Sequence, residues 1–153
     1  MKSIIWCVGI LLLTTNACKN ATSTTPKIVA QKAELVAGLS GIDINNLIQQ
    51  ADFVDFLFYH MDISVSQEDI ASIQTSAKFF SAEAKPAGKQ CAAIGRISFL
   101  SKGKIIREAD IHLSGACSYF TIIENKLAMG TNRISPEGVN FLQTFMNSYQ
   151  KPK

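Results

Sequence analysis

Three side chains that can carry acid–base or metal chemistry alternate along one stretch of the chain. Glu108, Asp110 and His112 are two residues apart, so in a strand they lie on one face. Two carboxylates and an imidazole could hold a divalent cation or support hydrolysis by acid–base chemistry. Alternate side chains of one strand are about 7 Å apart, however, too far for all three to ligate one ion without other elements. We therefore expect a solvated polar face, with a metal-dependent or hydrolytic site as the alternative.

The second histidine, His60, follows Tyr59 and precedes Asp62 by two residues. It could act with His112 only if the fold brought the two together, so we expect an exposed or hydrogen-bonded histidine. The chain contains no Gly-x-Ser-x-Gly elbow, no P-loop, no dinucleotide-binding fingerprint and no His-Glu-x-x-His motif. We therefore predict a protein that is not an enzyme and that uses no cofactor.

The first eighteen residues are typical of an export signal. Lys2 and the amino terminus form a short positive region, and Ile4 to Leu13 form an apolar run. As a helix this run spans about 15 Å, half of a bilayer core, which is too short to cross a membrane. Small residues at Thr15 and Ala17 fit a cleavage site immediately before Cys18. Residues 1–17 are therefore predicted to be a signal peptide.

A cysteine directly after such a leader resembles the lipobox of bacterial lipoproteins. Thr15 stands where most of these proteins carry Leu, so the box is similar to the looser Bacteroidetes type. The resemblance covers residues 1–18 and implies that Cys18 is acylated and becomes the N-terminus. Because Lys19 rather than Asp follows, it also implies delivery to the outer membrane of the cell envelope. An ordinary secretory leader, leaving a periplasmic or secreted protein, is the alternative.

Processing leaves two further cysteines, Cys91 and Cys117. An exported, oxidising setting favours a disulfide between them, which would stabilise the fold by about 3 kcal/mol in the chain-entropy model. An ideal meander would separate them by two strand spacings, about 9.6 Å, whereas a disulfide needs Cα atoms within about 7 Å. Either Cys91 lies in the loop before its strand, or the third strand of the meander lies beside the first.

The composition fits one small globular domain. Apolar residues make up 47% of the 153 residues and charged residues 18%, which excludes disorder for most of the chain. The net charge of +3 is small and scattered, so nucleic acid is not an expected partner. Residues 18–27 are polar and predict a tether between the lipid and a single domain, 28–150.

Apolar periodicity predicts helices in the first half of this domain. A weak helical pattern covers Ile28–Leu39, and a stronger one follows Asp43 as N-cap, from Ile44 to Met61. Within it, Phe53 to Tyr59 is so rich in aromatic residues that a buried strand fits equally well, and both interpretations stay open. Another helix is predicted from Ser66, as N-cap, towards Phe80.

The second half predicts an antiparallel meander of about four strands over residues 91–133. A three-residue turn with a left-handed Gly103 would place Leu100 opposite Lys104 and Arg96 opposite Glu108. That register gathers the apolar residues on one face, whereas a two-residue turn would mix charged and apolar side chains on both faces. The expected strands are Cys91–Leu100, Lys104–Leu113, Cys117–Glu124 and Leu127–Arg133; the apolar face comprises Ala93, Ile97, Phe99, Ile105, Ala109, Ile111 and Leu113.

The chain closes with a clear helix signal. Ser135 fits the N-cap, Pro136 the first helical residue and Glu137 the positive end of the helix dipole. An apolar stripe along this helix predicts that it packs on the sheet, which completes an α+β fold. The stripe comprises Val139, Leu142, Phe145, Met146 and Tyr149. We therefore expect a lipid-anchored, non-enzymatic domain whose partners are membrane lipid, through Cys18, and a protein or an apolar ligand.

Overall fold

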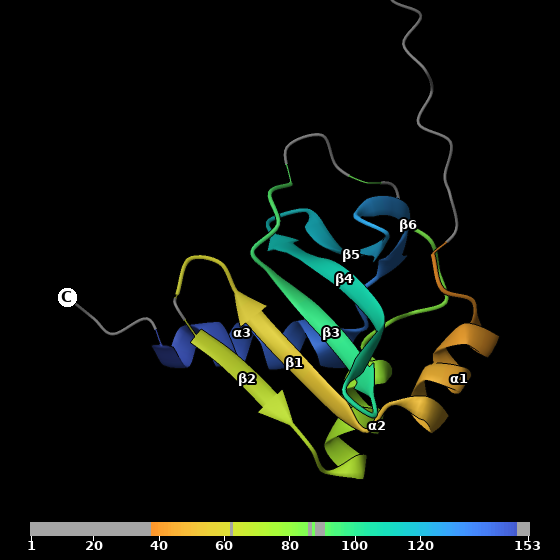
Figure 1. Ribbon diagram of the computed structural model, residues 1–153. Coiled ribbons are helices and arrows are strands. Elements are labelled where there is room, and N and C mark those ends of the chain that lie inside the picture. The colour runs from red at the N-terminus through yellow and green to blue at the C-terminus, as the bar shows by residue number, and fades with distance from the viewer. Residues whose placement is uncertain (1–37, 62, 86, 88–90, 150–153) are drawn as a thin grey trace, which may run out of the picture. The chain divides into compact units, whose positions relative to one another are not determined.

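The computed structural model describes residues 38–149, except 62, 86 and 88–90. The signal peptide, Cys18, the tether and all but the last two residues of the weak helical pattern lie outside them. The fold is α+β, as predicted (Figure 1). Its elements are α1 (Gly41–Gln50), β1 (Phe53–Phe58), β2 (Ile63–Gln67), α2 (Ile70–Ala77), β3 (Gly95–Ser101), β4 (Lys104–Ser114), β5 (Cys117–Glu124), β6 (Leu127–Arg133) and α3 (Pro136–Tyr149).

The six strands form one antiparallel sheet in the order β2-β1-β3-β4-β5-β6. The predicted meander supplies β3 to β6, and two further strands extend it at one side: β1, which was left open between helix and strand, and β2, which was not predicted. β1 resolves the ambiguity between helix and strand, because Val54, Phe56 and Phe58 are buried and alternate with more exposed residues. This period of two is the pattern of a strand with one face in the core.

The first helix begins with a capping box. Ser40 is the N-cap and accepts a hydrogen bond from the backbone N–H of Asp43, whose carboxylate accepts from the backbone N–H of Ser40. Asp43 is therefore the third helical residue rather than the N-cap predicted. The helix ends at Gln50, since the apolar pattern beyond Ala51 belongs to β1.

The second helix begins later than predicted. Its N-cap is Asp69, whose side chain accepts from the backbone N–H of Ser72 at 2.8 Å. Ser66, the predicted cap, instead lies in β2 and donates to Asp55 on the neighbouring strand. The error arose because both residues are good caps and β2 has few apolar residues to mark it as a strand. The helix also ends at Ala77, before Phe80.

The last helix was predicted correctly, and it packs across the sheet. Ser135 Oγ accepts from the backbone N–H of Gly138, and Leu142 is fully buried. The rings of Phe141 and Phe145 lie 5.6 and 4.9 Å from those of Phe56 and Phe58. These contacts place α3 over β1, as Figure 1 shows. Side chains from all three helices join one core on this face of the sheet.

The turn between β3 and β4 is tighter than predicted. Ser101 pairs with Lys104, so only Lys102 and Gly103 form the turn, with φ of 52° and 74°. Positive φ at both central residues is typical of a type I′ turn, whose twist suits an antiparallel pair. The predicted three-residue turn is therefore wrong.

A β-bulge then restores the predicted faces. Leu100 pairs with Ile105, but Phe99 pairs with Arg107, so Ile106 is an extra residue on β4. An extra residue reverses the alternation of the strand, and it compensates here for the shorter turn. Beyond the bulge the predicted core positions Ala109, Ile111 and Leu113 are buried. Ile105, before the bulge, is 56% exposed instead of joining the core.

The bulge also changes which polar side chains face each other. Arg96 lies opposite Asp110, not opposite Glu108 as predicted, and Ser98 lies opposite Glu108. The turn and the bulge together move β4 by two positions relative to the predicted ladder. A shift by two keeps each side chain on its face but gives it another partner.

Gly138 is a point of close packing at the start of α3. A Cβ added there would lie 2.8 Å from Phe79 Cβ and 2.9 Å from Ile134 Cγ2, and both of these residues are buried. Gly41, in the first turn of α1, has nothing within 4 Å of the same position. The two glycines therefore offer a matched comparison between a crowded and an open site.

We predict that G138A lowers the free energy of unfolding by about 1–3 kcal/mol, because the added methyl group overpacks the core. G41A should leave it unchanged or raise it, because alanine is favoured over glycine in helices by about 1 kcal/mol. Urea denaturation of both variants and the parent measures the difference. Equal stabilisation by the two substitutions would contradict the packing described for α3.

Candidate functional site on the open face of the sheet

The sheet has a second face on which none of the described helices packs, here called the open face. Its side chains alternate with the core residues along each strand. One row runs across the sheet as Ser64, Leu57, Arg96, Asp110 and Thr121, each paired with the next. The next row comprises Ser66, Asp55, Ser98, Glu108 and Ile123. The polar face expected around Glu108 and Asp110 therefore exists and extends over five strands.

Arg96 organises the charges at the centre of the open face. Its Nε donates to Asp110 Oδ1 at 2.8 Å, and its Nη1 lies 3.8 Å from Glu108 Oε1. The hydrogen bond to Asp110 raises the pKa of Arg96 above its already high usual value. All three side chains are only partly accessible, at 34% for Arg96, 27% for Glu108 and 21% for Asp110. Both carboxylates proposed as metal ligands are thus engaged by one guanidinium.

Tyr59 completes this network from the end of β1. Its Oη donates to the same Asp110 oxygen at 3.0 Å, although the two residues are 51 positions apart in the chain. Burial first, and then the hydrogen bond to Asp110 and its negative charge, raise the pKa of Tyr59. The phenol therefore remains a neutral donor to a carboxylate that also neutralises Arg96. Such a shared acceptor holds both side chains in one arrangement.

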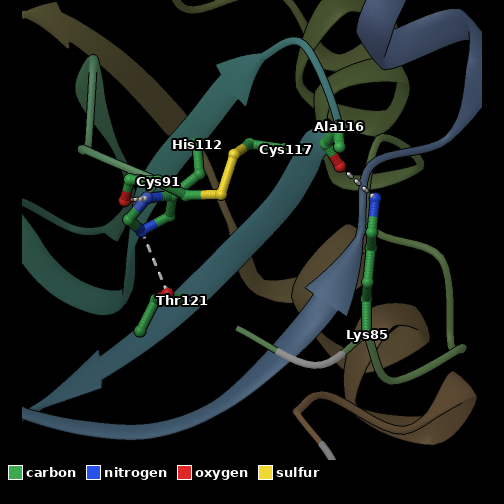
Figure 2. The surroundings of a disulfide bond; sticks show 6 residues. All are labelled: Lys85, Cys91, His112, Ala116, Cys117 and Thr121. Carbon is green, nitrogen blue, oxygen red and sulfur yellow. Dashed lines mark hydrogen bonds between the residues drawn. A yellow bond between two sulfur atoms is a disulfide. The ribbon is translucent and has the colours of Figure 1, made fainter. Parts of the chain in front are cut away.

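His112 uses both ring nitrogens within the fold. Nδ1 lies 2.9 Å from the carbonyl oxygen of Cys91, which can only accept, so Nδ1 carries a proton. Nε2 lies 3.1 Å from Thr121 Oγ1, and in this neutral tautomer it accepts from the hydroxyl. The ring also stacks on Tyr119, with centroids 4.5 Å apart. Figure 2 shows His112 held between Thr121 and the backbone of Cys91.

Cys91 and Cys117 form the predicted disulfide, with Cα atoms 5.9 Å apart. Cys91 lies before β3, which begins at Gly95, and β5 pairs with β4 and β6. The first of the two predicted geometries is therefore correct, because Cys91 belongs to the incoming loop. Figure 2 shows the bond beside His112.

The loop that carries Cys91 fastens to the far strands, and we call its described residues 81–85, 87 and 91–94 the strap. Ser81 and Glu83 bond the backbone of Arg133 on β6. Lys85 Nζ donates to the carbonyl of Ala116 at 3.0 Å, and the Lys85 carbonyl accepts from Thr131 Oγ1 (Figure 2 shows the Ala116 contact). With the disulfide, these bonds hold the strap against β4, β5 and β6.

The strap divides the open face into two parts. Tyr119 and Thr131 have open-face positions, yet they are only 2% and 9% exposed, so this end of the face is covered. At the other end, Leu57 and Tyr59 remain 47% and 41% exposed. The part formed by β2, β1 and β3 is therefore the accessible part.

The geometry gives the proposed catalytic residues separate partners. Glu108 and Asp110 face Arg96, His112 is held by Cys91 and Thr121, and His60 is exposed in the turn after β1. Within the residues that the structure describes, no three His, Cys, Asp or Glu side chains are placed to hold one metal ion. The arrangement is an ordered ion-pair and hydrogen-bond network on a rigid surface.

Two features of the surface were not predicted from the sequence: the contact of Tyr59 with Asp110 and a groove between two helices. Tyr59 was considered only as part of an apolar cluster, and its contact with Asp110 depends on β1 pairing with β3. A groove of about 520 Å³ between α2 and α3 was also missed, with Phe79, Phe141 and Phe145 among its lining residues. The apolar stripe predicted for the last helix omitted Phe141, which could have indicated it.

In the described part of the chain, no helix is long and apolar enough to cross a bilayer. No protein-family model, no curated protein and no solved structure matches the sequence. The open face is therefore interpreted from its own chemistry.

We predict that Tyr59 titrates above its usual pKa of 10.0 and that this titration is absent in Y59F. Between the usual and the raised pKa, the folded phenol keeps a proton that the unfolded chain releases. The free energy of unfolding should therefore fall as pH rises through this window, and Y59F should remove part of the fall. Phenolate absorbance and urea denaturation measure the two effects.

Y149F is the matched control, because Tyr149 is an exposed tyrosine on α3. It should leave the raised pKa of Tyr59 unchanged. A Tyr59 phenol that titrates at or below its usual value would show that the network with Asp110 does not form in solution.

Proposed function

We propose that the chain is a non-enzymatic, lipid-anchored binding domain of the bacterial cell envelope. Its binding surface is the accessible part of the open face, on β2, β1 and β3, and its ligand is a partner protein. The observation that carries the proposal is the Arg96–Asp110–Tyr59 network beside the exposed Leu57.

The composition of this surface suits protein recognition. Arginine and tyrosine contribute most often to the energetic centres of protein interfaces, where planar side chains pack against a partner. Here both are held by Asp110 before any partner arrives, so little side-chain entropy is lost on binding. Leu57 lies opposite Arg96 and adds an apolar contact in the same row.

The surroundings leave this surface open to a large ligand. On the edge strand β2, the neighbours of Asp55 and Leu57 are Ser66 and Ser64, whose small side chains do not cover the row. At the other side the strap ends over β4 to β6. A partner surface could therefore approach across the β2 edge without displacing any element.

The anchor rests on the leader and on the residues around Cys18. A short apolar run followed by Cys18 resembles a lipobox, and the polar stretch 18–27 would act as a tether. Two or three acyl chains hold a protein at a bilayer for practical purposes permanently, whereas one chain holds it weakly. The domain would then present its open face at the cell envelope. The resemblance to lipoproteins implies that this membrane is the outer membrane.

We predict that the protein purified from membranes with detergent begins at Cys18 and carries acyl chains. Its intact mass should also lack two hydrogens, because Cys91 and Cys117 are bonded. Mass spectrometry before and after reduction measures the acylated N-terminus and the disulfide separately. A mass that begins at Met1, or at an unmodified Cys18, would contradict the anchor and leave the disulfide standing.

We predict that a photo-crosslinking residue at Leu57 forms a discrete adduct in living cells, because Leu57 lies in the binding surface. The same residue at Ile70 is the matched control, since Ile70 is 71% exposed but on α2, on the helical side. Replacing Arg96 with Met should abolish the Leu57 adduct while the protein accumulates normally. Adducts of equal yield at Leu57 and Ile70 would contradict the assigned surface. A Leu57 adduct that persists when Arg96 is replaced with Met would also contradict it.

A further inference from the structure

Three of the large exposed apolar side chains lie in two hairpin tips. Ile105 belongs to the tip between β3 and β4, and Leu127 and Met129 belong to the tip between β5 and β6. They are 56%, 65% and 47% exposed. Hairpin tips of soluble domains are usually polar, so apolar residues here indicate a surface that meets an apolar medium or partner.

The two tips lie side by side at one end of the sheet. Pairing between β4 and β5 stops at Glu108 and Ile123. Beyond this pair both strands extend towards the same end of the sheet, where each leads into its hairpin turn. A shallow depression of about 290 Å³ is lined jointly by residues 105–108 and 123–125. We call residues 101–105 and 124–129 the tips. Because β5 lies between β4 and β6, Ile105 on β4 and Leu127 on β6 are about two strand spacings apart across the sheet, roughly 10 Å.

Both tips are built in the same way. Each has a two-residue turn with positive φ at both residues, Lys102-Gly103 in one and Asn125-Lys126 in the other. Each also has one extra residue a short way into the second strand, Ile106 in β4 and Met129 in β6. Because each bulge adds one residue, the side chains before it alternate between the two faces of the sheet out of step with those beyond it. Ile105, before the bulge, therefore faces solvent although Ala109 and Ile111 beyond it face the core.

The charges around these apolar side chains are mainly positive. Lys102, Lys104 and Lys126 are exposed in the tips, and Glu124 is the one acid among the tip residues. Asp52 lies beside the first tip, where it accepts the backbone N–H of Lys102. Lysine next to exposed aliphatic residues matches the boundary of an anionic bilayer, where the stem lies along apolar groups and the ammonium meets phosphate.

We propose that the hairpin tips insert into the headgroup region of an anionic membrane and form a second membrane contact. The inference rests on the proposed lipid anchor, which keeps the domain near the bilayer. As a random coil of ten residues, the predicted tether 18–27 would span on the order of 17 Å, so the anchor would keep the domain close to the bilayer surface.

The residue types favour lipid over a protein as the occupant. Protein interfaces are centred on aromatic residues and arginine, and residues 101–105 and 124–129 contain neither. A bilayer requires only apolar area and positive charge, which the tips provide.

The test uses the lipoprotein itself, purified from membranes and reconstituted into vesicles. The only tryptophan of the chain is Trp6, which leaves with the leader, so L127W introduces a single fluorophore into the processed protein. Vesicles contain phosphatidylcholine and phosphatidylglycerol, with or without bromine on the acyl chains. We expect blue-shifted tryptophan emission from L127W, and we expect brominated acyl chains to quench most of its fluorescence intensity. We expect both effects to weaken without phosphatidylglycerol.

I70W is the matched control, because Ile70 is equally exposed on α2 and should stay unquenched. Flotation and intact mass of each sample report the anchor independently. Protein that floats with its acyl chains but leaves L127W unquenched overturns the tip contact alone. A blue shift without quenching also overturns it, because a protein then covers the tips. Protein without acyl chains that fails to float overturns the anchor and, with it, this inference.

Discussion

All three helices bury their apolar residues against the same face of one sheet, and this one-sided burial determines the rest of the molecule. Val54, Phe56 and Phe58 of β1 meet α3 and the other helices in a single core. The alternate residues of every strand must then lie on a face without a helix. Charged side chains can occupy that face only when they are paired or reach water, which explains why Arg96 pairs with Asp110 and lies near Glu108 there.

The elements that could be predicted are those where several local signals agree. For the last helix, Ser135, Pro136 and the apolar stripe indicate the same structure, and the strands β3 and β4 alternate clearly. β1 was ambiguous because Phe53 and Leu57 are apolar as well as the three buried residues, which hides the period of two. β2 offers few apolar residues and a serine that resembles a helix cap.

The candidate site was predicted in its face but not in its contacts. That Glu108, Asp110 and His112 share a face follows from strand geometry, and their common polar environment was expected. The partners could not be predicted, because the shorter turn and the bulge together shift Arg96 from Glu108 to Asp110. Tyr59 lies far from Asp110 in sequence, and only the pairing of β1 with β3, which was not predicted, brings them together.

The extra residues Ile106 and Met129 also have a consequence for how this sequence can change over evolutionary time. In an unbulged hairpin, losing or gaining one residue in the turn reverses the orientation of all residues beyond it. Here the odd residue already absorbs such a reversal before the core begins. A change of one residue in either turn therefore preserves the interior only when the bulge of that hairpin is lost at the same time.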